Sequence, residues 1–191
     1  LMRILPLVFF LRTKPIAERY KVTKEVSSLT HRHIRSVIAC FYYLEFARLL
    51  MEGVDKKDAY RQLMTEVTTF LQRQDINANE IRLFSRLLEG DISEIPRDQI
   101  QSSGYVLHTL EASIWSLMTT VTYSEAVLTA VNLGSDTDTT GAVTGGLAGL
   151  LYGEGNIPKE WRSDLKRRED IERLADDLAR KTACAHHELL R

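Results

Sequence analysis

The chain has 191 residues, 44% of them apolar, which is enough to build an ordinary buried core in a single domain spanning residues 1–191. Its 25 basic and 26 acidic side chains leave a formal charge of −1, which excludes the broad positive field typical of nucleic-acid-binding proteins. Cys40 and Cys184 lie far apart in helix-like segments. We therefore expect neither a disulfide framework nor a cysteine metal site, and we place the protein in the reducing cytoplasm.

A short apolar run, residues 4–11, follows Met2 and Arg3. A charge before an apolar run resembles a signal peptide, but no small-residue cleavage site follows. The run is also far shorter than the roughly 20 residues that cross a bilayer. We expect a buried helix or helix–loop piece here. Because the first residue is Leu, we also expect that the chain was cut from a longer protein.

Apolar residues that recur with helical spacing predict helices along the rest of the chain. Pro15 is suited to open a charged surface helix. Residues 31–51 are apolar on nearly every face, which is typical of a helix in the centre of a bundle. Gly53 is expected to end this helix and Asp55 to cap the next one, after which a short helix ends at Gly90.

Residues 91–104 predict a long loop, because they contain proline, serine and glycine, and such loops often line sites. Helical spacing returns in residues 105–118. Thr122 or Ser124 can cap a further helix, which Gly134 ends.

A helix rich in small residues is predicted from Asp136 to about Tyr152. Its Gly141, Gly145 and Gly149 form one bare stripe, against which a neighbouring helix can approach closely. Gly-x-x-x-Gly also occurs in membrane helices, but about a dozen apolar residues are too few to span a bilayer. We expect no membrane association.

The last predicted helix carries Ile171, Leu174 and Leu178 on one side and dense charge elsewhere, which we interpret as a solvated face. No strand-like alternation of useful length and no internal repeat occur in the sequence. The sequence therefore predicts an all-α fold.

Asp136, Asp138 and Thr139 place two carboxylates and a hydroxyl together at the start of a helix, directly after a glycine stop. Hard oxygen ligands of this kind suit Mg²⁺. Asp and Thr at a helix start also satisfy free backbone N–H groups and match the helix dipole. The short motif alone therefore leaves a structural role open.

Two other kinds of site use similar residues. An EF-hand loop beginning at Asp136 would require a bidentate Glu where Leu147 stands, so this alternative fails. A haloacid-dehalogenase-type phosphatase uses Asp-x-Asp-x-Thr, which Asp136, Asp138 and Thr140 match. That family places the motif after a buried strand near the start of the chain, whereas a helical segment precedes it here.

Residues 132–140 read Asn-Leu-Gly-Ser-Asp-Thr-Asp-Thr-Thr and are followed by the Gly/Ala-rich helix and by Pro158 and Trp161. This arrangement resembles the C-terminal signature of the ADP-ribosylglycohydrolases. Residues 1–6 resemble the end of that family's Asn-Gly-Ser-x-Met-Arg segment, and residues 27–31 resemble its Thr-His segment. Residues 102–115 also match the family's lead-in to the metal helix. The resemblance implies an all-α, orthogonal multi-helix bundle, of which this chain is the C-terminal part.

The resemblance also implies an activity and a cofactor. ADP-ribosylglycohydrolases hydrolyse the bond between ADP-ribose and its acceptor, a protein or a small molecule, at two Mg²⁺ ions, and Mn²⁺ is an alternative metal. Asp136, Asp138 and Thr139 would be the metal ligands, with Asp136 and Asp138 catalytic and Asp138 bridging both ions. Paired ions in such sites hold the ribose hydroxyls, polarise the anomeric carbon and orient a water molecule.

The same resemblance places further residues at the substrate: Met2, Arg3, His31, Tyr105 and Ser135. His31 would position the ribose or a phosphate, and Tyr105 would face the adenosine. A structural explanation stays open for several of them, since a histidine at a helix start, an arginine at the surface and a tyrosine after a turn are common without any ligand.

The family's Gly-x-x-x-Gly-Asp-Ala-x-Gly opening and its Thr-Asp-Asp segment, which supply the other metal ligands, do not occur in this sequence. Half a site binds Mg²⁺ weakly, so we expect catalysis to require a missing N-terminal segment or a second chain. The competing hypothesis is a catalytically inactive fragment or relative that acts as an ADP-ribose-binding or protein-interaction module. His108, His186 and His187 have no partner at metal-ligand spacing and receive no role.

Overall fold

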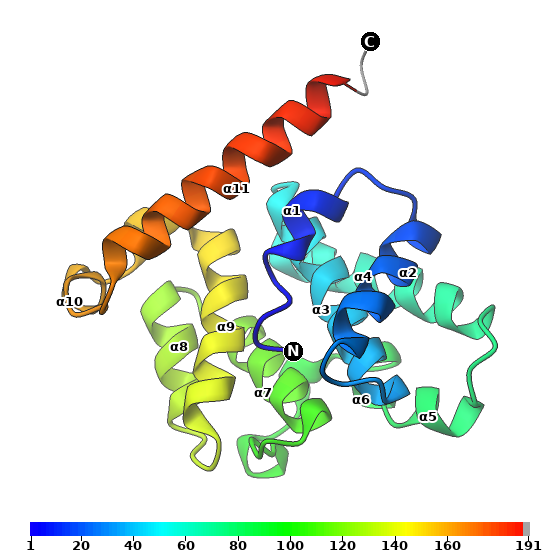
Figure 1. Cartoon of the computed structure of the whole chain (residues 1–191). Coiled ribbons are helices and arrows are strands. Elements are labelled where there is room, and N and C mark those ends of the chain that lie inside the picture. Colours follow the sequence, from blue (N-terminus) through cyan, green and yellow to red (C-terminus); the bar gives the residue numbers. More distant parts are fainter. Residues whose placement is uncertain (189–191) are drawn as a thin grey trace.

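The computed structural model describes residues 1–188, and the side-chain surroundings of residues 1–182. All regular elements of this part of the chain are helical, which confirms the predicted all-α fold (Figure 1). The side chains of Cys184, His186 and His187 lie outside the described residues. The helices are α1 (Leu7–Leu11), α2 (Ile16–Ser28), α3 (Ile34–Met51), α4 (Lys56–Gln72), α5 (Ala78–Arg82), α6 (Ser85–Leu88), η1 (Ile92–Glu94), η2 (Arg97–Gln99), α7 (Val106–Met118), α8 (Tyr123–Val131), α9 (Thr137–Tyr152), η3 (Glu154–Asn156), α10 (Lys159–Ser163) and α11 (Arg168–Glu188).

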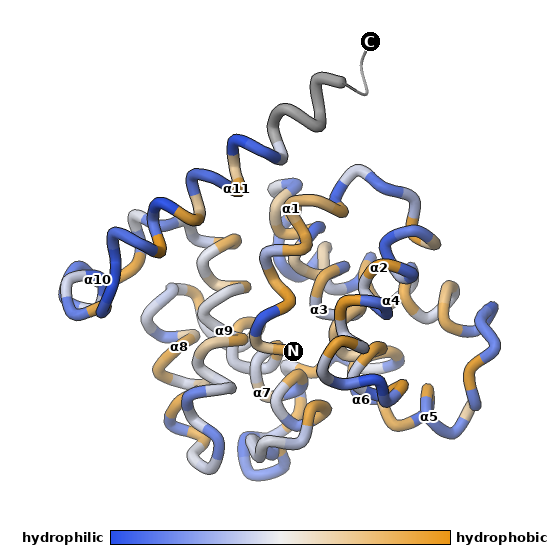
Figure 2. The backbone as a smooth tube through the Cα atoms, viewed as in Figure 1, coloured by the Kyte–Doolittle hydropathy of each residue, from blue (hydrophilic) through white to orange (hydrophobic). Residues whose placement is uncertain are grey.

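Helix α3 is the central element, because it packs against α1, α2, α4, α7 and α9. All its residues from Ser36 to Leu50 are buried, which confirms the prediction of a helix in the middle of a bundle. Figure 2 shows the same distinction in colour, with hydrophobic residues concentrated in the inner helices and hydrophilic ones along α10 and α11.

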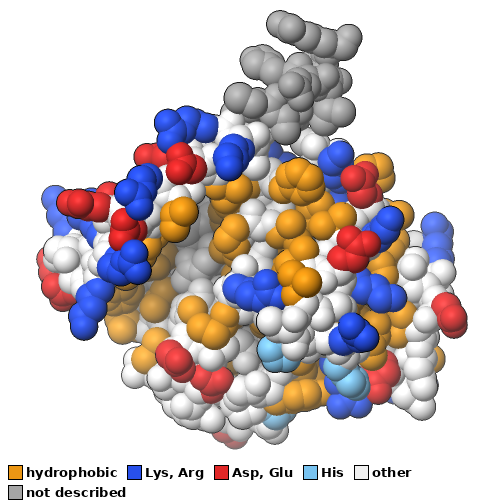
Figure 3. All heavy atoms as spheres, viewed as in Figure 1, with side chains coloured by type: hydrophobic (Ala, Val, Ile, Leu, Met, Phe, Trp, Pro, Cys, Tyr) orange, Lys and Arg blue, Asp and Glu red, His pale blue; other side chains and the backbone are white. Residues whose placement is uncertain are grey.

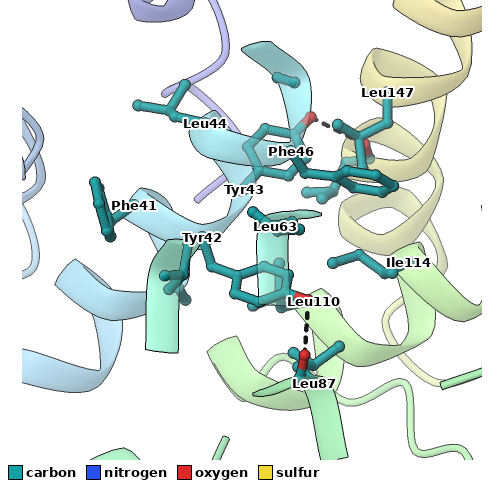
Figure 4. Packing of buried hydrophobic residues seen from close by; sticks show 14 of the residues in the cluster. Phe41, Tyr42, Tyr43, Leu44, Phe46, Leu63, Leu87, Leu110, Ile114 and Leu147 are labelled. Carbon is teal, nitrogen blue, oxygen red and sulfur yellow. Dashed lines mark hydrogen bonds between the residues drawn. The ribbon is translucent and has the colours of Figure 1, made fainter. Parts of the chain in front are cut away.

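Two buried tyrosines of α3 connect the centre of the bundle to its neighbours (Figure 4). The Tyr42 hydroxyl donates to the Leu87 carbonyl oxygen at 2.9 Å, and the Tyr43 hydroxyl donates to the Val143 carbonyl oxygen at 3.0 Å. Burial raises the pKa of both hydroxyls, so each stays neutral and acts as a donor. The two bonds satisfy the only polar group of each ring and fix α3 against α6 and α9.

The N-terminal segment packs into the core. Ile4, Val8 and Leu11 are each 2% exposed, which confirms the predicted buried helix–loop piece. No described helix is both long enough and apolar enough to cross a membrane.

Several predicted helix ends are confirmed, and one element is corrected. The Asp55 carboxylate accepts from the backbone N–H of Lys57 at 2.9 Å, and the Thr122 hydroxyl accepts from the backbone N–H of Glu125 at 3.2 Å. The single short helix predicted before Gly90 is instead divided into α5 and α6. The helix breaks at Phe84, whose φ of −94° and ψ of 10° depart from helical values while its ring is fully buried.

The predicted close approach of a helix to the α9 glycines is confirmed at Gly141 and Gly145 but not at Gly149. A Cβ added at Gly141 would lie 3.0 Å from Val131, and one at Gly145 would lie 3.2 Å from the Tyr123 hydroxyl, so both face α8. Gly149 meets nothing within 4 Å. Gly146 instead faces the N-terminal segment and α3, where a Cβ would lie 2.6 Å from Leu5 and 2.7 Å from the Tyr43 hydroxyl.

Helix α11 extends along the upper edge of the view in Figure 1 and contacts the rest of the bundle near α1. Two residues of its apolar side are exposed, Ile171 at 47% and Leu174 at 66%, whereas Leu178 is half-buried.

Candidate functional site

A pocket of about 670 Å³ opens where four separate segments meet. These segments are the first three residues, the connection from α2 to the first turn of α3, the start of α7 and the start of α9. In Figure 3, histidine side chains lie beside basic side chains on the face turned to the viewer. The pocket is lined by Leu1, Met2, Arg3, Thr30, His31, His33, Arg35, Ser36, Gly104, Tyr105, Val106, Thr109, Asp136 and Thr139.

This pocket collects most of the residues predicted to form a site. Met2, Arg3, His31 and Tyr105 line it together with Asp136 and Thr139, although they come from distant parts of the sequence. Two predicted site residues do not line it: Ser135 and Asp138 are both exposed at the start of α9. Their roles, like those of the residues inside the pocket, stay predictions.

The acidic end of the pocket is built by a sharp turn between α8 and α9. Gly134, with a φ of 83°, and Ser135, with a φ of 58°, both adopt the left-handed conformation and redirect the chain into α9. Asp136 follows at the cap position but forms no side-chain capping hydrogen bond of ordinary geometry. Its carboxylate lines the pocket.

The charge of Asp136 is favoured by its neighbours. Hydrogen bonding with the Thr139 side chain, and then with Asp138, lowers the pKa of the Asp136 carboxyl. The positive end of the α9 dipole acts in the same direction. Asp136 is therefore an anion at neutral pH.

Asp136, Asp138 and Thr139 fit one side of a magnesium site, since two carboxylates and a hydroxyl on one turn are hard oxygen donors. In the part of the chain that the structure describes, no cluster of three or more His, Cys, Asp or Glu side chains could hold a metal ion. Two carboxylates and one hydroxyl could supply only part of the ligands of such an ion.

Thr30 organises the basic wall of the pocket. Its hydroxyl accepts from Arg3 Nη2 at 3.1 Å and lies 3.0 Å from His31 Nδ1. Arg3 Nη2 also donates to the Val26 carbonyl oxygen at 2.8 Å. Both side chains remain exposed, so their remaining polar atoms can reach a ligand.

Arg35 is a pocket residue that sequence reasoning missed. Its guanidinium donates to both carboxylate oxygens of Glu80, at 2.6 and 3.0 Å, and Nη1 donates to the Tyr105 hydroxyl at 3.4 Å. These bonds raise the pKa of Arg35 and lower that of Glu80, so both stay charged. No local pattern reveals the contact, because Glu80 lies 45 residues further along the chain.

Two histidines turn out to have local structural partners. His33 caps α3, since its Nδ1 accepts from the backbone N–H of Arg35 at 3.2 Å. His108 Nδ1 lies 2.7 Å from Ser103 Oγ, and its ring packs edge-on against Tyr105 with centroids 5.0 Å apart. Burial, and then the charge of Arg86, lowers the pKa of His108, so it stays neutral at pH 7. The contact with Tyr105 orients one wall of the pocket.

Comparison with known proteins agrees with the resemblance seen in the sequence. Residues 1–187 match the family model described as ADP-ribosylglycohydrolase. The chain is 34% identical over 167 residues to the ADP-ribosylarginine hydrolase Tri1 of Serratia proteamaculans (strain 568), a match covering 87% of this chain and 42% of that protein. It is 33% identical over 179 residues to the Tri1 hydrolase of Pseudomonas putida (strain GB-1), covering 93% of this chain and 44% of the relative.

A solved structure has a similar fold. A chain of an ADP-ribosylglycohydrolase-related protein complex superposes with a TM-score of 0.74 at 30% identity, covering 92% of this chain and 57% of the other. The present chain thus spans less than half the length of the two Tri1 hydrolases.

Proposed function

Because the chain belongs to the ADP-ribosylglycohydrolase family, we propose that the protein hydrolyses an ADP-ribosyl glycosidic bond with Mg²⁺ as its cofactor. The observation that carries the proposal is the pocket, which gathers basic side chains and the Asp136 carboxylate in one hollow. ADP-ribose offers a matching pattern: an anionic diphosphate for the arginines and neighbouring ribose hydroxyls that can bind a cation held by the carboxylates.

An arginine side chain of a modified protein is the proposed acceptor. This choice follows two of the similar proteins, which are named ADP-ribosylarginine hydrolases. A third similar protein, from Rhodospirillum rubrum, is 40% identical over 80 residues, 41% of this chain and 27% of that protein, and is named an ADP-ribosyl-[dinitrogen reductase] glycohydrolase. Its name also describes a protein substrate.

The basic residues of the pocket would bind and orient the substrate. Arg3 and Arg35 carry fixed positive charges for the diphosphate, and His31 lies beside Arg3 on the same threonine. The Tyr105 ring, held edge-on by His108, offers an apolar surface to the adenine. Each of these side chains is restrained by a protein contact, which lowers the entropy lost on binding.

The acidic end of the pocket would hold the metal ion that binds the reacting ribose. Asp136, Asp138 and Thr139 would hold the metal, and the remaining ligands would come from residues outside this chain. When bound, Mg²⁺ supplies positive charge for the ribose hydroxyls and for an attacking water. In the reaction, the water oxygen bonds to the anomeric carbon, and the bond to the arginine nitrogen breaks. The electron pair leaves with that nitrogen, which takes up a proton, so one water yields free ADP-ribose and arginine.

The test uses the full-length protein that contains these residues. It is incubated with an ADP-ribosylated arginine protein, and free ADP-ribose is measured with Mg²⁺, with EDTA, and with EDTA followed by excess Mg²⁺ or Mn²⁺. We expect release with Mg²⁺, loss with EDTA and recovery with either metal. Binding of ADP-ribose without any release would instead support the module hypothesis, and release that EDTA does not affect would contradict the role of the metal.

A further inference from the structure

One loop residue, Ser102, is bonded to both sides of the turn that leads into α9. Its carbonyl oxygen accepts from the backbone N–H of Asp136 at 3.0 Å, and its hydroxyl donates to the Gly134 carbonyl oxygen at 2.9 Å. Ser102 is only 6% exposed, so water competes little for these bonds. The pair of bonds fixes the turn directly before the Asp136 carboxylate.

Gly104 of the same loop leaves the space that the Asp136 carboxylate occupies. A Cβ at position 104 would lie 2.9 Å from Asp136 Oδ2 and 3.9 Å from its Cγ, and the first distance is shorter than van der Waals contact allows. Gly104 is not among the glycines with positive φ. The position is therefore restricted by space beside the carboxylate rather than by backbone conformation.

The loop is anchored from behind on α7. The Ser103 hydroxyl lies 2.7 Å from His108 Nδ1, and the Thr109 hydroxyl donates to the Ser103 carbonyl oxygen at 3.2 Å. Thr109 is buried, so this anchor is part of the packed bundle. An added methyl group at Gly104 would consequently displace the free end of the Asp136 side chain rather than the loop.

We propose that Ser102 and Gly104 are positioning residues that set the direction of the Asp136 carboxylate and thereby the geometry of the cation site. The inference rests on the proposed function, because it assumes that Asp136 binds a divalent cation. Mg²⁺ requires near-ideal octahedral geometry, so a displaced carboxylate loses much of its value as a ligand. Residues that orient metal ligands typically change metal affinity by about 10- to 100-fold when altered.

The decisive variant is Gly104→Ala in the full-length protein, with Mg²⁺ binding measured by calorimetry. We expect Mg²⁺ affinity to fall by roughly 10- to 100-fold, while the melting temperature in EDTA stays nearly unchanged because only a side-chain end must move. Gly149→Ala is the matched control: it adds the same methyl group to α9, where nothing lies within 4 Å. We expect unchanged Mg²⁺ affinity and a melting temperature raised by a few degrees.

A double-variant cycle separates positioning from general damage. If Gly104 acts through Asp136, then Gly104→Ala in an Asp136→Ala background should weaken Mg²⁺ binding no further, whereas an independent structural defect would add its full effect. Ser102→Ala, which removes only the bond to Gly134, should reduce Mg²⁺ affinity a few-fold and provides a second variant should Gly104→Ala fail to fold.

The outcomes separate this inference from the proposed function. If Asp136→Ala weakens Mg²⁺ binding but Gly104→Ala and Ser102→Ala leave it unchanged, the positioning role is overturned and the metal site stands. Additive effects in the cycle overturn it as well. If the unaltered protein binds no Mg²⁺ and Asp136→Ala changes nothing, the metal site itself is contradicted, and the inference with it.

Discussion

Helix α3 carries two arginine–glutamate contacts of nearly the same geometry in very different surroundings. In the buried charge network, which consists of Arg19, Glu45 and Arg48, Arg19 Nε lies 2.7 Å from Glu45 Oε1. At the pocket, Arg35 Nε lies 2.6 Å from Glu80 Oε2. The Glu45 side chain is 1% exposed, whereas that of Glu80 is 22% exposed.

The same contact therefore has a different physical role in each place. A buried carboxylate has lost its hydration, so the network is tolerated only because Arg19 and Arg48 both approach Glu45. A pair that water reaches contributes less to folding, and the side chains of Arg35 and Glu80 are 35% and 22% exposed. The contact between Arg35 and Glu80 is better explained by where it holds the guanidinium, which is at the pocket wall and beside Tyr105.

The largest effect on stability is expected for Glu45→Gln. The change leaves two arginines, whose side chains are 12% and 10% exposed, without their shared carboxylate. We expect the free energy of unfolding to fall by about 3 kcal/mol, measured by urea denaturation followed by circular dichroism. Glu80→Gln is the matched control, since it makes the same chemical change, and its unfolding midpoint should shift little. Equal losses in the two variants would remove the distinction between them.

The next largest effect concerns the metal rather than the fold. Asp138→Asn in the full-length protein should weaken Mg²⁺ binding more than Asp136→Asn, because we expect Asp138 to bridge both ions, and the loss should be at least roughly tenfold. Calorimetry with Mg²⁺ measures it. Asp138 is exposed, so the denaturation midpoint in EDTA should not change. Equal or reversed effects of the two substitutions would contradict the ranking.

The metal-site motif can be recognised in the sequence, whereas the buried charge network cannot. Asp136, Asp138 and Thr139 are neighbours in the chain, so their convergence at a helix start is visible as a motif. The burial of Glu45 and Arg48 could not be predicted, because these two residues lie in a helix whose other positions are almost all apolar. Periodicity gives only the average character of a helix face. A buried charge becomes recognisable only when its partner on another helix is known.

The pocket could be predicted only in part for a similar reason. Family resemblance identified Met2, Arg3 and His31, but Arg35 and His33 carry no signal apart from their position in space. The division of α5 from α6 depends on packing of the Phe84 side chain, and Gly149 shares the spacing of Gly141 without sharing its neighbour. Spacing gives the direction of a side chain on its helix, whereas tertiary packing decides what it meets.

A smaller effect is expected for Arg35→Lys. Lysine keeps the charge but loses the forked contact with Glu80 and the bond to Tyr105, so more side-chain freedom is lost when ligand binds. ADP-ribose affinity, measured by calorimetry on the full-length protein, should fall by roughly two- to tenfold. Arg32→Lys is the control, because Arg32 lies on the same connection but does not line the pocket. A similar loss in both variants would mean that general charge, not a held guanidinium, attracts the ligand.

The smallest effect tests whether burial, rather than ionic character, makes the buried charge network important. Glu52 also pairs with Arg48, at 2.8 Å, but its side chain is 48% exposed, so water can replace the contact. Glu52→Gln should therefore lower the free energy of unfolding by only about 0.5 kcal/mol, although it removes a carboxylate from the same arginine as Glu45→Gln does. Urea denaturation in low and high salt measures the difference, and high salt should abolish the Glu52 effect while leaving most of the Glu45 effect. If Glu52→Gln lowered the free energy of unfolding as much as Glu45→Gln does, the charges would act as one unit. The difference from the Arg35–Glu80 pair would then depend on the number of charges and not on their burial.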